Sequence, residues 1–200
     1  LFYKPFRNSQ PIIVVIASFG ISLMYRAMIQ LTAGVDNVTY ADGIEFPLEF
    51  LKPLRIIERY IYIILVTVLL VAALHYLLTR TRIGKAMRAM ADDADLARVT
   101  GIDTELVVRW TWIVGASLAA TAGLLLGLDT QLFPAMGWNL LLPVFAAAIL
   151  GGLGQPYGAI LGGYVIGAME ELSTYPWIGD TPFVSPDYKS AVAFGVMVLL

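Results

Sequence analysis

The chain has 200 residues, of which 58% are hydrophobic and only 14% are charged. Soluble globular domains do not have this composition, so the sequence predicts an integral membrane protein. The chain has no cysteine, which excludes disulfides and thiolate metal sites, and its single histidine leaves a zinc site without a ligand set. No serine has a candidate general base in the sequence pattern, which argues against nucleophilic catalysis. The basic residues are scattered and form no patch for binding nucleic acid. We therefore expect no catalytic residues, no metal, no cofactor held by this chain and no nucleic-acid partner.

The first apolar run, residues 11–34, is long enough for the roughly 20 residues that cross the hydrocarbon core of a bilayer. It begins with a proline, which the first turn of a helix tolerates. Arg26 lies about two-thirds of the way along this run. Its long side chain could reach the nearer interface, pair with another helix or face a transported solute. Arg26 is therefore a candidate substrate-path residue.

A polar connection, residues 35–59, follows the first span, and its acidic side chains outnumber its basic ones. We expect it to be an external loop. Residues 60–78 predict a second span, with Tyr60 and Tyr76 near its ends, where aromatic rings favour the membrane interface. His75 is interpreted as an interfacial or packing residue, because no carboxylate within this span could share a proton relay with it.

Residues 79–105 form the longest stretch that could not lie in a membrane, because five basic and five acidic side chains fall within it. Residues of high helix propensity are frequent here, so we expect one or two short helices on the membrane surface. The positive-inside rule places this stretch in the cytoplasm. Its charged residues are Arg80, Arg82, Lys85, Arg88, Asp92, Asp93, Asp95, Arg98, Asp103 and Glu105.

Residues 106–128 predict a third span, with Arg109, Trp110 and Trp112 in its first turns as an interfacial anchor. Small residues recur in it at every fourth position. This spacing lets another helix approach the backbone closely, and the same spacing occurs again in residues 158–172. The expected packing residues are Gly115, Ala119, Gly123 and Gly127 in the first set, and Gly158, Gly162, Gly163 and Gly167 in the second.

Two shorter apolar segments, residues 138–152 and 158–172, lie on either side of a glycine-rich turn. As helices they reach roughly 24 Å, short of a hydrocarbon core of ~30 Å. Either they cross the membrane fully or they dip in and return. Paired short segments interrupted by glycine are typical of discontinuous helices around a transport path. The turn therefore supplies further substrate-path candidates: Gly151, Gly152, Gly154 and Gln155.

Residues 173–187 are rich in proline and aromatic side chains and predict an external loop, and residues 188–200 predict the start of a further span. The expected fold is an all-α integral membrane protein. It is a polytopic helical bundle of about six spanning or partly spanning segments, in a single domain, with one helical stretch on the cytoplasmic surface. The sequence opens on a polar linker and stops inside an apolar run, so we expect more spans before residue 1 and a tail after residue 200.

Three stretches resemble one family of membrane proteins. Residues 79–89, TRTRIGKAMRA, followed by Asp92-Asp93, Ala97 and Gly101-Ile102-Asp103, are similar to the cytoplasmic loop of ABC importer permeases of the branched-chain amino acid (Liv) family, H-type subunit. Residues 145–163 resemble the glycine-rich segment of the same family, and residues 3–7 resemble its basic linker. The Ala97-x-x-x-Gly101-Ile102 element is also similar to the coupling loop of vitamin B12 and siderophore permeases.

The resemblance implies a permease in a bacterial cytoplasmic (inner) membrane, surrounded by lipid. Its partners would be a second permease subunit, two cytoplasmic ATPases and an extracytoplasmic solute-binding protein. The ATPases would hold ATP and Mg²⁺, and the solutes would be branched-chain or other amino acids, amides or urea. Residues 79–105 would be the coupling loop that docks on an ATPase. The expected coupling residues are Gly84, Lys85, Arg88, Asp92, Asp93, Ala97, Gly101 and Ile102.

Two other functions fit parts of the sequence. A secondary transporter or channel would also use broken helices, but it should carry a coupling-ion site or a relay of carboxylates within its spans, and the predicted spans have neither. A structural membrane scaffold would use the small-residue packing faces, but it would leave the long charged stretch without a purpose.

Overall fold

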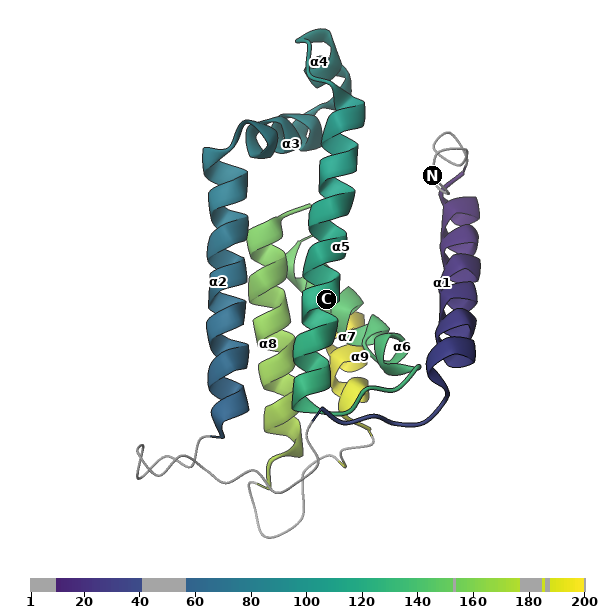
Figure 1. The fold of residues 1–200 in the computed structure, drawn as a ribbon. Coiled ribbons are helices and arrows are strands. Elements are labelled where there is room, and N and C mark those ends of the chain that lie inside the picture. Colours follow the sequence, from purple (N-terminus) through teal and green to yellow (C-terminus); the bar gives the residue numbers. More distant parts are fainter. Residues whose placement is uncertain (1–9, 41–56, 153, 177–184, 186–187, 200) are drawn as a thin grey trace. The chain divides into compact units, whose positions relative to one another are not determined.

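The computed structural model describes residues 10–40, 57–152, 154–176, 185 and 188–199. Within these ranges the chain is built of helices, and its β structure is one isolated bridge between Val38 and Leu132 (Figure 1). The predicted all-α fold is confirmed. The predicted linker at residues 3–7 and most of the two predicted external loops lie outside the described residues.

In the part of the chain that the structure describes, three helices are long and apolar enough to cross a membrane: α1 (Pro11–Ala33), α2 (Glu58–Arg80) and α5 (Thr104–Asp129). They contain 23, 23 and 26 residues, so each exceeds ~30 Å at 1.5 Å per residue. Their large apolar side chains are mostly exposed, among them Ile16, Leu65 and Ile113. Such surfaces suit lipid, where an exposed aliphatic side chain costs nothing.

The chain divides into two compact units, one of residues 1–37 with 133–200 and the other of residues 38–132. In the second unit α2 and α5 lie side by side. They are joined by two short helices, α3 (Arg82–Asp92) and α4 (Ala94–Val99). The sequence predicted this surface stretch, and the structure divides it into two helices at Asp93.

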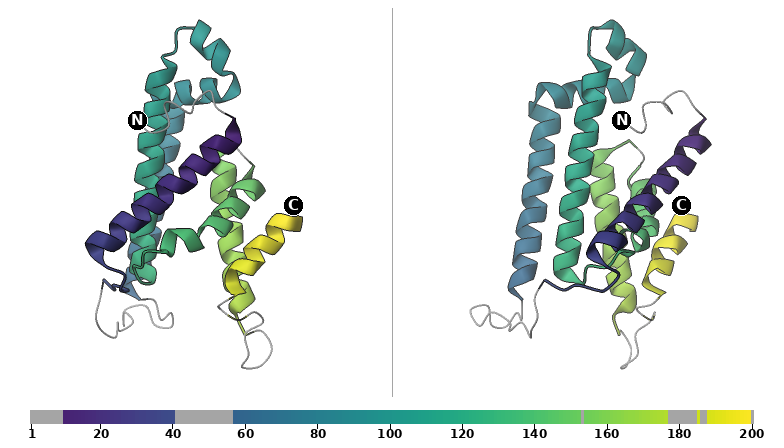
Figure 2. Two further views of the ribbon diagram at one scale, coloured as in Figure 1. Left: turned by 90° about the vertical axis from the view of Figure 1, so that its right-hand side faces the viewer. Right: turned by 45° about the vertical axis from the view of Figure 1, so that its right-hand side comes forward.

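The other helices of the first unit (Figure 2) are α6 (Met136–Asn139), α7 (Leu141–Gly151), α8 (Pro156–Thr174) and α9 (Lys189–Leu199). With 19 residues, α8 is longer than the segment predicted over residues 158–172. The segment predicted as one helix over residues 138–152 is broken at Leu140. Pro143 explains the break. It has no N–H to donate to the carbonyl of Asn139, and its ring would clash with that carbonyl. In the first turn of a new helix at Leu141, the same proline is tolerated.

Three glycines allow α7 and α8 to pack backbone against backbone: Gly151, Gly158 and Gly162. A Cβ atom placed on Gly158 would lie 1.7 Å from the carbonyl oxygen of Gly151, and one on Gly162 would lie 2.2 Å from that of Ala147. The turn between the helices needs two further glycines, Gly152 and Gly154, at φ values of +87° and +89°, which side chains disfavour. The glycine-rich segment thus forms a tight helical hairpin.

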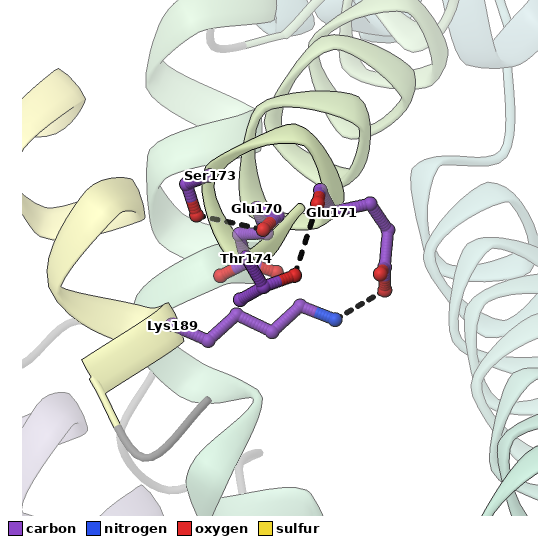
Figure 3. A network of polar contacts seen from close by, with 5 residues as sticks. All are labelled: Glu170, Glu171, Ser173, Thr174 and Lys189. Carbon is purple, nitrogen blue, oxygen red and sulfur yellow. Dashed lines mark hydrogen bonds and ion pairs between the residues drawn. The ribbon is translucent and has the colours of Figure 1, made fainter. Parts of the chain in front are cut away.

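The helix α9 completes a small core with this hairpin. Ala146 of α7, Ile166 of α8 and Ala193 of α9 are buried together. At one end of α8, Lys189 forms an ion pair with Glu171, while the hydroxyl of Ser173 donates to the carbonyl of Glu170 at 2.7 Å (Figure 3). The ion pair is largely exposed, so it adds little to stability and the apolar core holds α9.

Replacing Gly162 by alanine should destabilise the hairpin by about 1–3 kcal/mol, because the new methyl group would force α7 and α8 apart. Gly163→Ala is the matched control. It makes the same change one residue away, where no atom lies within 4 Å of the new Cβ, and it should be neutral or stabilising by up to ~1 kcal/mol. Thermal unfolding of the two purified variants in detergent measures the difference. Equal midpoints would contradict the close approach.

Candidate functional site

The candidate site is the pair of helices that joins α2 to α5. Figure 1 shows α3 running across from the end of α2 towards the start of α5, with α4 projecting beyond it. Both helices carry charged side chains along their length, whereas the two spans that they connect are charged only near their ends. A connector made of helices can transmit a displacement to both spans, provided that its corners are rigid.

The corner between α2 and α3 is held by Thr81 and Gly84. The hydroxyl of Thr81 donates to the carbonyl of Leu77 at 2.6 Å and accepts the N–H of Gly84 at 3.0 Å, so one side chain closes α2 and caps α3. Gly84 is buried against the last turn of α2. A Cβ there would lie 2.1 Å from the carbonyl oxygen of Leu77 and 2.6 Å from the Cα of Leu78. Only glycine fits this contact.

Asp93 forms the second corner. It is the C-cap residue of α3 and the N-cap residue of α4. Its Oδ1 accepts hydrogen bonds from the N–H groups of Asp95 and Leu96 at 3.0 and 2.9 Å. Asp103 caps α5 in the same manner, accepting from Glu105 and Leu106 at 3.0 and 3.1 Å. A carboxylate at a helix start also interacts favourably with the helix dipole.

The end of α4 is a Schellman motif. Gly101 adopts φ +88°, its N–H donates to the carbonyl of Arg98 at 3.1 Å, and the N–H of Ile102 donates to the carbonyl of Ala97 at 3.1 Å. Ala97 is only 4% exposed. The sequence element Ala97-x-x-x-Gly101-Ile102 therefore closes α4 and turns the chain into α5.

The exposed side chains of this region are of two kinds. Four of the predicted coupling residues, Lys85, Arg88, Asp92 and Asp93, are exposed and charged. Two large apolar side chains on α4 are also exposed, Leu96 at 61% and Val99 at 85%. Such side chains on a polar helix outside the spans are suited to burial against another protein.

The predicted coupling residues thus divide into two groups. Gly84 and Ala97 are buried, and Gly101 sets the turn, so these three shape the surface. The charged residues lie on the surface itself, and Ile102 is partly buried. Sequence reasoning missed Thr81, Leu96 and Val99 as site residues. A threonine directly before a helix is a recognisable capping signal, and Leu96 and Val99 are large apolar residues beside the charged Asp95 and Arg98.

The other predicted residues belong to other helices than α3 and α4. Arg26 is partly buried in α1, and the substrate-path candidates Gly151, Gly152, Gly154 and Gln155 form the α7–α8 turn of the same unit. Gly127 is buried beneath Leu132 and Tyr40. No described atom lies within 4 Å of a Cβ built on Gly115, Gly123, Gly163 or Gly167, and Ala119 is exposed, so the described residues leave this part of the predicted packing faces uncovered.

Gly101→Ala should strain the Schellman motif by about 1–2 kcal/mol, because alanine disfavours the left-handed conformation. No neighbour crowds this position, so the effect is confined to the backbone. Gly101→Asn is the control, since asparagine adopts this conformation more readily. Hydrogen exchange of the Gly101 and Ile102 amides should be faster in the alanine variant and less affected in the asparagine variant. Unchanged protection in Gly101→Ala would contradict the motif.

Comparison with known proteins identifies the family. Residues 6–200 match the family described as branched-chain amino acid transport system / permease component. The chain is 32% identical over 99% of its length to the high-affinity branched-chain amino acid transport system permease protein LivH of Escherichia coli K12, and covers 64% of that protein. It is 31% identical to the corresponding protein BraD of Pseudomonas aeruginosa, with the same coverage.

A third relative is archaeal. The probable branched-chain amino acid transport permease protein LivH of Methanocaldococcus jannaschii is 33% identical over 84% of this chain, which covers 55% of that protein. The chain thus spans a little under two thirds of the length of these curated relatives. No solved structure matches it significantly. The resemblance drawn from the sequence is confirmed, and the chain belongs to the family of permease components of branched-chain amino acid transport systems.

Proposed function

We propose that this chain is the membrane-spanning permease subunit of an ATP-driven importer, and that α3 and α4 form its docking surface for a cytoplasmic ATPase. The observation that carries the proposal is the capped, glycine-packed connection of α3 and α4 to two spans, with Leu96 and Val99 exposed at its projecting end. Membership of the permease family supports it.

The complete importer would contain a second permease subunit, two ATPases that hold ATP and Mg²⁺, and an extracytoplasmic solute-binding protein, in a bacterial cytoplasmic membrane. Its solutes would be branched-chain amino acids, which the names of the relatives support, or related amino acids, amides or urea. The uncovered glycines of α5 and α8 would suit close packing against another helix of this assembly.

Docking would use the exposed apolar side chains for affinity and the surrounding charges for orientation. Burying Leu96 and Val99 removes apolar area from water. Lys85, Arg88, Asp92 and Asp93 add exposed side chains of both signs of charge to the same connector, which favours one docking register over others. The ATPase would then move α3, and the fixed corner at Gly84 would carry α2 with it.

Solute would pass along the other unit of the chain. The α7–α8 turn exposes backbone at Gly152 and Gly154, where two positive-φ glycines interrupt the helices. Irregular backbone inside a membrane has to be covered by protein or to line a water-filled cavity. This supports Gly151, Gly152, Gly154 and Gln155 as substrate-path residues, together with Arg26.

Val99→Glu tests the docking surface. Val99 is 85% exposed, so the change should leave the permease folded. A carboxylate buried at an interface should lower retention of the co-expressed ATPase, and leucine uptake with it, about tenfold or more. Val99→Ile keeps the apolar surface and serves as the control. Normal ATPase retention and uptake by Val99→Glu would refute docking at α4, and uptake that needs no ATPase would favour a secondary transporter.

A further inference from the structure

We propose that Arg26 of α1 binds the carboxylate of the transported solute, with Ser22 and Gln30 as flanking hydrogen-bond donors. This inference deepens the proposed function and rests on it, since it concerns the solute path of the same permease. Arg26 is the one charged residue of α1.

The depth of Arg26 sets it apart from charges at the membrane surface. It lies seven residues before Ala33, the last residue of α1, which is about 10 Å along the helix axis. A charged side chain at such a position is costly in hydrocarbon, so it is expected to face the protein interior or a watery path and to pair there.

The face of α1 that carries Arg26 is turned towards the broken helix of the same unit. Phe19 packs edge-to-face against Trp138 of α6, with ring centroids 5.2 Å apart. Arg26 follows Phe19 by seven residues, close to two full turns, so the two share a face. Arg26 is partly buried there, whereas Met24 and Leu31 on the opposite face are 65% and 87% exposed. Discontinuous helices such as α6–α7 commonly line solute sites.

The donors on this face are unused within the described residues. No hydrogen bond or ion pair joins the side chains of Ser22, Arg26 or Gln30 to another described residue. By contrast, Ser18 donates to the carbonyl of Val14 at 2.8 Å and Thr32 to that of Met28 at 2.9 Å, as hydroxyls in helices often do. Ser22 is therefore available to another acceptor.

The side chains of Ser22, Arg26 and Gln30 together favour a carboxylate as the bound group. Ser22, Arg26 and Gln30 recur at every fourth residue, so their side chains follow one another along the helix. A guanidinium presents two parallel donors that match the two oxygens of a carboxylate, and the hydroxyl and amide on either side add neutral donors. An α-amino acid offers a carboxylate. A protein carboxylate or a lipid phosphate would satisfy the same donors, and the test separates these.

The experiment uses the complete importer, with the full-length permease, its partner subunits and binding protein, in proteoliposomes. Radiolabelled L-leucine uptake is measured per assembled complex. Arg26→Gln should lower kcat/KM about tenfold or more in normally assembled complexes, with Arg26→Lys between it and wild type. Met24→Gln, a polar change on the opposite face, should remain within about twofold of wild type.

Other outcomes would overturn the inference. If Arg26→Gln takes up leucine at the wild-type rate per complex, Arg26 does not bind the solute. If in addition the yield of complex falls, Arg26 forms an ion pair within the protein. Uptake should also be measured in proteoliposomes with and without anionic lipid. If removing anionic lipid lowers wild-type uptake to the level of Arg26→Gln, and Arg26→Gln shows that level in both lipids, then Arg26 binds a lipid phosphate.

A milder variant covers the case in which Arg26→Gln does not assemble. Ser22→Ala combined with Gln30→Leu should lower uptake severalfold in a normally assembled complex, and unchanged uptake would overturn the inference. If the wild-type complex takes up no amino acid, the proposed function fails and this inference fails with it. If wild type and Arg26→Gln take up leucine equally, only this inference fails.

Discussion

Inside a bilayer every backbone N–H and C=O group has to be hydrogen-bonded within the protein, because hydrocarbon offers no partner. Helices meet this requirement along their length, so the structure depends on what happens at their ends. In the connector between α2 and α5, which lies outside the spans, the helix ends are closed by protein groups as well: Thr81 between α2 and α3, Asp93 between α3 and α4, Gly101 after α4 and Asp103 before α5. These closures make the connector between two spans stiff, which is what a docking surface needs in order to transmit movement.

Glycine plays two opposite roles on neighbouring positions of one helix. Gly158 and Gly162 bring α8 against the backbone of α7, where a methyl group has no room, while Gly163 and Gly167 have open space around them. Because α8 is a helix, these pairs lie on different faces. One face builds the hairpin of this chain, and the other remains smooth and uncovered. On α5, Gly127 is likewise crowded and Gly115 is open, although both belong to one set spaced by four.

Much of the fold could be predicted from the sequence because the bilayer imposes a simple rule on composition. Runs of apolar residues predict α1, α2 and α5, whose observed ends lie within two residues of the predicted ones. The break before α7 was missed, although Pro143 signals it, because the apolar run continues through the break. Spacing by four identified which glycines share a helix face but could not show which face has a neighbour. That depends on tertiary packing, as it does for Gly84, whose contact lies on a preceding helix.

The two proposals for this chain rest on the same physical argument, applied once to apolar side chains in water and once to a charge in hydrocarbon. Leu96 and Val99 are large apolar side chains on a polar helix outside the spans, so roughly 1.5–3 kcal/mol of transfer free energy per side chain remains unrealised until a partner covers them. Arg26 is a charge in an apolar helix, where its presence costs ~2.5–3.5 kcal/mol unless it is paired or hydrated. Neither cost is offset by a contact among the described residues. Each cost is therefore recovered by contacts outside the described residues, and in both proposals a bound second molecule supplies these contacts.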